Sequence, residues 1–74
     1  MTPYANSAGN SGVVAYQIGA DRITVQFIGG DIYVYTIASA GVKNINQIKQ
    51  LAVAGRGLST FISTTVKDKY ERKN

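Results

Sequence analysis

Three segments in the first half of the chain have the hydrophobic pattern of β-strands, and apolar and polar side chains alternate most cleanly in the second of them. The segments are Val13–Ile18, Arg22–Ile28 and Ile32–Ile37. The third consists entirely of β-branched and aromatic residues, which suit a pleated sheet. Short glycine-containing turns at residues 19–21 and 29–31 separate the segments. The pattern therefore predicts an antiparallel meander.

The turns also predict which side chains share a face. Pairing Ile18 with Ile23 across the first turn places the apolar residues of both strands on one side of the sheet. The further pairs expected from this register are Tyr16 with Val25 and Val14 with Phe27.

The register of the third strand has two alternatives, because the side chains of a strand change face at every residue. A two-residue loop after the second strand places Ile32 and Val34 on the apolar face. A three-residue loop with a bulge places Tyr33, Tyr35 and Ile37 there instead. The sequence leaves both alternatives open.

The hydrophobic period becomes helical in the second half of the chain. Ser39 is a suitable N-cap for a first helix, and Gly55 is a suitable residue to end it. A second helix is predicted from Leu58 to Tyr70, where the apolar residues again recur at helical spacing. Its many β-branched residues lower helix propensity, so a strand stays open as an alternative for this segment.

These elements predict an α+β fold, with a three-stranded antiparallel β-meander followed by two α-helices packed on one face. One domain is expected at 74 residues, and its folded part spans residues 13–70. Residues 1–12 are rich in Ser, Asn, Ala and Gly and predict a flexible N-terminal arm. Residues 71–74 are expected to form a basic C-terminal tail.

Composition excludes most kinds of protein chemistry. The chain has no histidine and no cysteine, and its only carboxylate side chains are Asp21, Asp31, Asp68 and Glu71. Catalytic acids and bases, activated nucleophiles and metal ligands come mainly from these residue types. We therefore expect no enzymatic activity, no cofactor and no metal. No apolar run reaches the ~18 residues that cross a bilayer, and no signal-peptide pattern is visible, which predicts a soluble cytoplasmic protein.

Positive charge is concentrated in the second half of the chain. Residues 1–42 have a net charge of −1, whereas residues 43–74 carry seven basic and two acidic side chains, a net charge of +5. Such asymmetry indicates a surface that faces a polyanion. The alternative is a solvated face that only keeps the protein soluble.

Two groups of residues are candidates for contact with nucleic acid. Tyr33 and Tyr35 would stack on bases if they face outward, although tyrosines at this spacing also serve as cover for a core. The basic residues near the C-terminus would contact phosphates, although cations also stabilise a helix end. These basic residues are Lys67, Lys69, Arg72 and Lys73.

Arg56 is a third candidate. It lies in the segment Gly55–Thr60, where backbone N–H groups at a helix start, with an arginine beside them, can hold a phosphate oxygen. The segment lacks the lysine and the preceding strand of a P-loop. The alternative is a plain connector between two helices.

The order of several residues resembles the KTSC domain, a family named for its occurrence at the C-terminus of some lysyl-tRNA synthetases. The resemblance covers about residues 12–70 and is carried by Tyr16, Ile23-x-Val25-x-Phe27, Gly30, Tyr33-x-Tyr35 and Phe61-Ile62-Ser63-x-x-Val66-Lys67-x-x-Tyr70. The chain departs from the family at Ile37-Ala38-Ser39, where Val-Pro is common, and by the insertion of Leu58-Ser59-Thr60 before the aromatic residue. The resemblance implies a compact β-meander with helices and no catalysis. By residue matching it points to Tyr33, Tyr35, Lys67 and Tyr70.

Two functions are expected from these observations. The first is a non-enzymatic module that binds nucleic acid, RNA in particular, through its basic C-terminal face. The second is a protein-interaction module, since stand-alone members of the KTSC family occur in bacteria and phages and suggest a phage or mobile-element protein that docks on a host protein complex. In that case an exposed edge strand, Val13–Ile18 or Ile32–Ile37, would pair with the partner. A monomer and a homodimer both fit the sequence.

Overall fold

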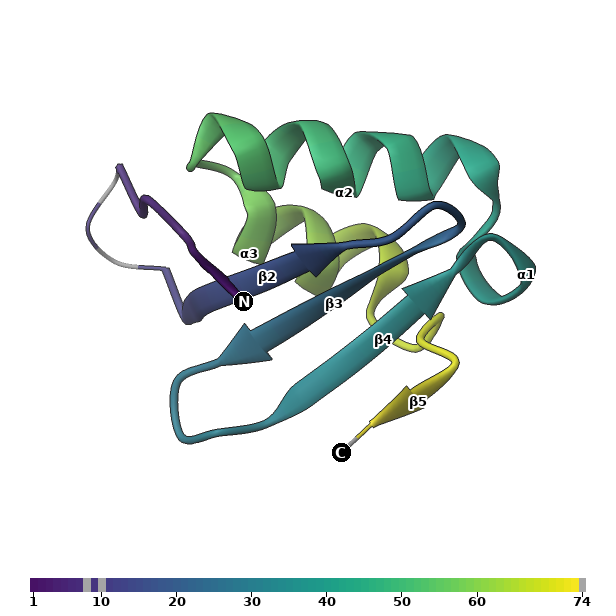
Figure 1. Cartoon of the computed structure of the whole chain (residues 1–74), viewed down its shortest axis with the longest axis horizontal. Helices are drawn as coiled ribbons and strands as arrows, with labels where there is room; N and C mark the ends of the chain where they lie inside the picture. Colours follow the sequence, from purple (N-terminus) through teal and green to yellow (C-terminus); the bar gives the residue numbers. More distant parts are fainter. Residues whose placement is uncertain (8, 10, 74) are drawn as a thin grey trace.

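The computed structural model describes residues 1–7, 9 and 11–73, and these form a mixed α+β fold around one antiparallel sheet (Figure 1). Within this part of the chain, the sheet has five strands in sequential order: β1 (Thr2–Pro3), β2 (Val13–Ile18), β3 (Arg22–Phe27), β4 (Ile32–Thr36) and β5 (Arg72–Lys73). The helical elements are α1 (Ile37–Ala40), α2 (Val42–Ala54), α3 (Leu58–Phe61) and the π-helical η1 (Ile62–Val66). The predicted antiparallel sheet and α+β class are confirmed, but three strands and two helices were too few.

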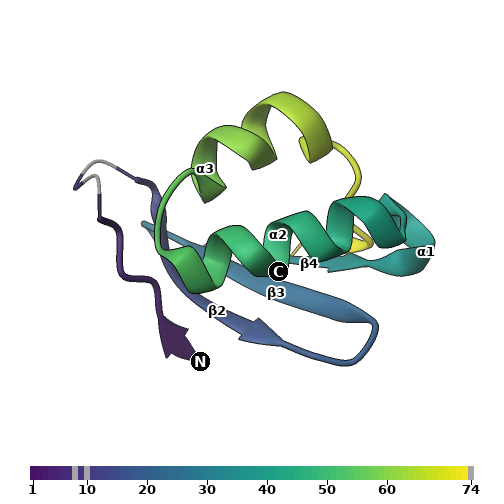
Figure 2. The ribbon, with the colours of Figure 1, turned by 90° about the horizontal axis from the view of Figure 1, so that it is seen from above.

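The helices cover one face of the sheet. Figure 2 shows α2 and α3 on the same side of the strands, and the core lies between these layers. The apolar side chains of one face of β3 and of one stripe of α2 point into this core. Those that are fully buried include Ile23, Val25, Ile45 and Ile48. Thr24 lies on the opposite sheet face, on which the described part of the chain places no helix.

The third strand adopts the register that follows from the three-residue loop. Val25 pairs with Tyr33 and Ile23 with Tyr35, so both tyrosines lie on the face that carries the core. The loop uses Gly29 at φ 92° and Gly30 at φ 98°, a backbone conformation that favours glycine. The alternative that placed Ile32 and Val34 on this face is excluded. Ile37 does not join it, because it begins α1.

A β-bulge changes the predicted register of β2. Ile18 pairs with Ile23 as expected, but the pairing shifts between Val13 and Ala15, so that Val13 lies opposite Phe27. Val13 is 1% exposed and Val14 is 41% exposed. The predicted pair of Val14 with Phe27 was therefore wrong, because the bulge adds one residue to β2 and moves Val14 out of the core face.

The predicted first helix is divided at Gly41 into α1 and α2, and Gly41, not Ser39, is the N-cap of α2. Thr36 is the N-cap of α1, and its side-chain oxygen accepts the N–H of Ser39 at 3.1 Å. The hydroxyl of Ser39 in turn accepts the N–H of Thr36 at 3.0 Å, completing a capping box. Ser39 is thus the partner of the cap rather than the cap itself. As predicted, the following long helix, α2, ends at Gly55, which has φ 76° and donates its N–H to Leu51.

Both chain ends pack on the domain. In the segment predicted as a flexible arm, residues 1–12, β1 pairs with β2 and Tyr4 is 6% exposed within the core. In the predicted basic tail, residues 71–74, β5 pairs with β4. The second helical segment ends at Val66 instead of Tyr70, so the chain can turn back toward the sheet. Residues 8 and 10 of the predicted arm and residue 74 of the predicted tail lie outside the described residues.

Candidate functional site

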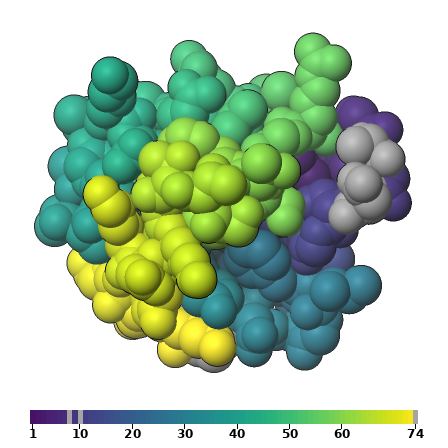
Figure 3. All heavy atoms as spheres, turned by 180° about the vertical axis from the view of Figure 1, so that it is seen from behind, coloured from purple at the N-terminus to yellow at the C-terminus, as the bar shows by residue number. Residues whose placement is uncertain are grey.

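A cleft of about 310 Å³ opens on the helix-covered face of the sheet, between the β3–β4 turn and η1. Figure 3 shows the molecular face on which η1, the C-terminal segment and the β3–β4 turn adjoin. The cleft is lined by Phe27, Ile28, Asp31, Tyr33, Tyr35, Ile62, Ser63 and Lys67. Most of these side chains are apolar or aromatic, and the charged ones come from opposite sides of the opening. Such a cleft with a few polar groups is typical of a binding site.

The π-helical turn forms the helical wall of this cleft. Two hydroxyls, those of Ser63 and Thr64, donate hydrogen bonds to the Thr60 carbonyl at 3.1 and 2.7 Å. Hydroxyls that bond back to the preceding turn compete with the helical backbone pattern, and β-branched residues add to that effect. The widened turn is a feature that is frequent at functional sites. It leaves Ile62 buried and Ser63 and Lys67 exposed at the cleft mouth.

Tyr33 lies at the centre of an aromatic cluster beside the cleft. The rings of Phe27 and Tyr70 meet it edge to face, with centroids 5.4 and 5.0 Å away. The ring of Tyr35 lies nearly parallel to it at 6.4 Å. These geometries are favourable for aromatic pairs. Tyr33 itself is only partly buried.

The Tyr35 hydroxyl is buried in the described part of the chain. The residue is 0% exposed, and its hydroxyl has no hydrogen-bond partner among the described residues. Leaving such a group unsatisfied costs about 1–3 kcal/mol. Burial, followed by the charges of Tyr33 and Tyr70, raises the pKa of the Tyr35 phenol to about 12. The group is therefore held neutral and can donate or accept a hydrogen bond.

Two lysines supply positive charge at the site. The ammonium nitrogen of Lys73 lies 5.4 Å from the centroid of the Tyr33 ring, within the range of a cation–π contact. Lys67 is exposed and belongs to the cleft wall. The Asp31 carboxylate also lines the cleft and is exposed, so one negative charge opposes the two positive ones.

Five of the eight residues predicted from the sequence to contact nucleic acid come together here. They are Tyr33, Tyr35, Lys67, Tyr70 and Lys73. Stacking on the two strand tyrosines was conditional on their facing outward. Both instead lie on the face that carries the core, where Tyr35 is fully buried and Tyr33 is partly buried. Arg72 pairs with Val34 and therefore points to the other sheet face from its neighbour Lys73. Lys69 is exposed in the turn that follows η1.

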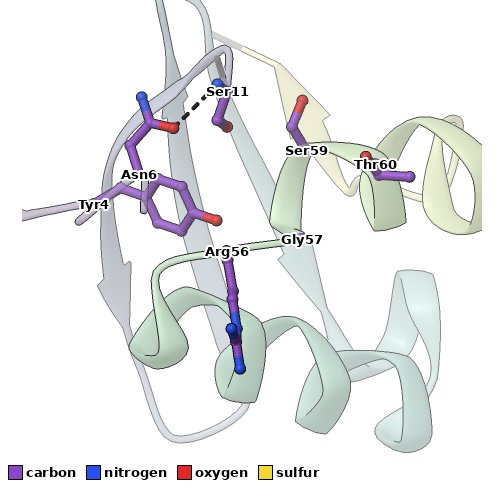
Figure 4. A pocket seen from close by; sticks show the side chains of 7 residues that line it. All are labelled: Tyr4, Asn6, Ser11, Arg56, Gly57, Ser59 and Thr60. Atoms are coloured by element: carbon purple, nitrogen blue, oxygen red, sulfur yellow. Dashed lines mark hydrogen bonds between the residues drawn. The ribbon is translucent and has the colours of Figure 1, made fainter. Parts of the chain in front are cut away.

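Arg56 lies at a separate cavity, between the N-terminal segment and the start of α3. This cavity also measures about 310 Å³ and is lined by Tyr4, Asn6, Ser11, Arg56, Gly57, Ser59 and Thr60. Figure 4 shows the Arg56 side chain pointing away from Asn6 and Ser11, which are hydrogen-bonded to each other at 3.0 Å. The helix that starts here, α3, has four residues. The Arg56 guanidinium and the backbone N–H groups at the start of α3 therefore do not form a common phosphate site in this conformation.

Sequence interpretation missed the apolar wall and the acidic group of the cleft. Phe27, Ile28, Asp31, Ile62 and Ser63 line it but were not proposed as site residues. Phe27 and Asp31 had a usable signal, because the three-residue loop that sets the Tyr33 register also brings these two residues together. Ile62 and Ser63 had none, since their approach to the β3–β4 turn depends on the packing of a distant segment.

The described residues contain no group of three or more His, Cys, Asp or Glu side chains that could hold a metal ion. Their helices are all too short or too polar to cross a membrane. In comparisons with known proteins, no protein-family model, no curated protein and no solved structure matches the chain. The resemblance to the KTSC domain therefore stays a prediction.

Proposed function

We propose that this chain is a non-enzymatic module that binds single-stranded nucleic acid, RNA in particular, on the face that contains the cleft. The observation that carries the proposal is the partly buried Tyr33 ring with the Lys73 ammonium 5.4 Å from its centroid, beside an aromatic cleft with Lys67 at its mouth. Proteins that bind single strands combine these two features, since cations contact the phosphates while aromatic rings stack on the bases.

The positions of the lysines support binding of a nucleic-acid strand on this face. Lys67 and Lys73 flank the aromatic cluster, and Lys69 lies between them in the sequence on an exposed turn. A strand that passes along these lysines would leave its bases free to reach the cleft. Asp31 lies close enough to Lys73 to contribute to its raised pKa, after the larger effect of Tyr33, so Asp31 offsets part of the attraction of Lys73 for phosphate.

The state of the carboxylates supports action by contact rather than by catalysis. Asp21 forms an exposed ion pair with Arg22 at 3.1 Å, and the other three carboxylates are also exposed. A general acid or base usually has a pKa shifted by burial toward the working pH. With no histidine or cysteine in the sequence, exposed carboxylates are poor candidates for this role.

A second candidate function, binding of a protein partner, is favoured by one observation. Ile28 is 74% exposed next to the apolar wall of the cleft. A partner or a second copy of the chain would cover it by inserting an apolar side chain. Strand addition at β2 or β4 is less suitable, because β1 and β5 already pair with parts of their outer edges.

The proposed function is tested by the salt dependence of binding to a fluorescent single-stranded RNA, measured by anisotropy between roughly 50 and 200 mM salt. Two to four phosphate contacts predict a log–log slope of roughly −1.4 to −2.8 for a single strand. Lys67→Ala should make the slope less negative by roughly 0.7, whereas Lys43→Ala, which removes an exposed lysine from the start of α2, should leave it unchanged. An affinity that does not depend on salt would contradict phosphate contact.

The same protein sample distinguishes the second candidate. If the RNA does not bind and light scattering shows dimers that Ile28→Glu dissociates, the cleft face is an interface between copies of the chain. A monomer at all concentrations that also binds RNA favours the first proposal.

A further inference from the structure

The Tyr35 hydroxyl is a buried polar group that the fold itself leaves unused. It has no hydrogen-bond partner among the described residues, although Tyr35 is 0% exposed. Buried polar atoms in folded proteins nearly always have a partner, so each exception calls for an explanation. For packing in the core alone, phenylalanine would serve equally well at this position. The hydroxyl therefore points to a role beyond packing.

Tyr35 also belongs to the wall of the cleft, whose volume is about 310 Å³. Small-molecule sites begin at about 300 Å³, which makes this space suitable for a single flat group rather than a large ligand. Its other walls come from the Phe27 ring, the Tyr33 ring and Ile62. A flat, partly apolar ligand with polar atoms on its edge would match both the walls and the unused hydroxyl.

The groups at the mouth define the rest of such a ligand. Lys67 lies at the mouth and Lys73 next to Tyr33, and these two cations outnumber the Asp31 carboxylate, so the flat group would be attached to something negatively charged. A nucleobase on a phosphate chain has this combination of flat ring, polar edge and adjacent anion. We propose that the cleft holds one unpaired base of the strand, with its polar edge hydrogen-bonded to the Tyr35 hydroxyl. This inference rests on the proposed function.

Access to the hydroxyl requires side chains at the mouth to move. Ile28, Ser63 and Lys67 are all exposed, so few packing contacts hold them in place. A base in a duplex is paired and stacked and cannot enter. The site therefore selects single strands, because extrusion of a base from a duplex costs free energy.

The experiment measures anisotropy at one fixed salt concentration with three RNA probes of equal charge. One is a single strand, one is the same strand with abasic sugars in its central half, and one is a hairpin duplex. Wild-type protein should bind the single strand about tenfold more tightly than either of the other probes. Equal affinity for all three probes would overturn base insertion and also the preference for single strands, leaving phosphate contact alone. Binding to none of them would overturn the whole proposed function.

The role of the hydroxyl is tested by Tyr35→Phe, with Tyr16→Phe as the matched control on β2. Tyr16 is a half-buried tyrosine of the same sheet face that lies outside the cleft. Tyr35→Phe should weaken binding of the single strand about fivefold and leave binding of the abasic probe unchanged. Its thermal unfolding midpoint should stay equal to that of wild type or rise. Unchanged binding of the single strand by a folded Tyr35→Phe variant would overturn the role of the hydroxyl.

Discussion

Ser7 donates its backbone N–H to the carbonyl oxygen of Gly55 at 2.7 Å, which ties the N-terminal segment to the end of α2. The approach is close, since a Cβ on Gly55 would lie 2.6 Å from the Cβ of Ala5. Gly55 is therefore required for two reasons. Its φ of 76° favours glycine, and the N-terminal segment occupies the space that a side chain would need.

Gly55→Ala is expected to destabilise the fold by more than its backbone strain alone. The left-handed conformation costs an alanine about 1–2 kcal/mol, and the clash with Ala5 adds to that. Gly57→Ala is the matched control, because Gly57 has φ 78° but an added Cβ would only reach ordinary contact with Leu51 at 3.5 Å. The free energy of unfolding in urea should fall further for Gly55→Ala than for Gly57→Ala.

Ala5→Gly, introduced into the Gly55→Ala variant, should restore part of the lost stability by removing the atom that clashes. Equal losses in the two glycine variants, with no recovery in the double variant, would show that residues 1–7 are not docked on α2.

The bulge in β2 predicts different costs at two adjacent valines. Val13→Ala removes a side chain that is 1% exposed and should lower the free energy of unfolding by about 2 kcal/mol. Val14→Ala changes an exposed position and should have an effect within about 0.5 kcal/mol. Chemical denaturation of both variants checks this order. A larger loss of unfolding free energy for Val14→Ala would indicate that β2 has the register without the bulge.

The sheet was the most predictable part of the structure, because its signals are local. The alternation of Ile23, Val25 and Phe27 identifies the core face of β3 without knowledge of the rest of the chain. The glycine pair 29–30 locates the second turn but does not specify its length, so two registers for Tyr33 stayed open. Packing decides between them, because only one register places Tyr35 under the helices.

The elements that sequence interpretation missed depend on contacts between distant residues. A two-residue strand such as β1 or β5 is too short to show alternation, so its pairing becomes visible only in the folded chain. Ser39 was predicted as the N-cap of a single helix because α1 is too short to show a period of its own and Thr36, which caps it, ends a strand-like run. In the site, the tyrosines and lysines could be identified by residue type. Their meeting with Ile62 and Asp31 follows from the tertiary fold.

Glu71 attaches the C-terminal segment to β4. Its carboxylate accepts a hydrogen bond from the buried Thr36 hydroxyl at 3.1 Å, and its backbone N–H bonds to the Val34 carbonyl at 2.7 Å. Glu71→Ala should lower the free energy of unfolding by about 1 kcal/mol and increase amide exchange of Lys73. Asp68→Ala, at an exposed position in the preceding turn, serves as the control. Identical behaviour of the two variants would contradict a structural role for this hydrogen bond.

The raised pKa of Tyr35 predicts a loss of stability in alkali. The phenol titrates near 10 in the unfolded chain and at about 12 in the folded protein. The folded state therefore holds this proton more tightly, and its contribution to stability is complete below pH 10 and is lost as the pH rises toward 12. Urea unfolding of wild type should weaken over this range more than that of Tyr35→Phe. Parallel pH profiles would show that Tyr35 titrates normally.

The most direct measurement of the central claim, that a basic aromatic cleft on this face binds single-stranded RNA, compares two charge reversals in one binding assay. Lys67→Glu reverses a charge at the cleft mouth, and Lys43→Glu reverses an exposed charge at the start of α2. We expect Lys67→Glu to reduce affinity for single-stranded RNA by about tenfold and Lys43→Glu by less than about twofold, in folded proteins of equal net charge. Equal reductions by both variants would mean that net charge alone attracts RNA, and this would contradict a site at the cleft.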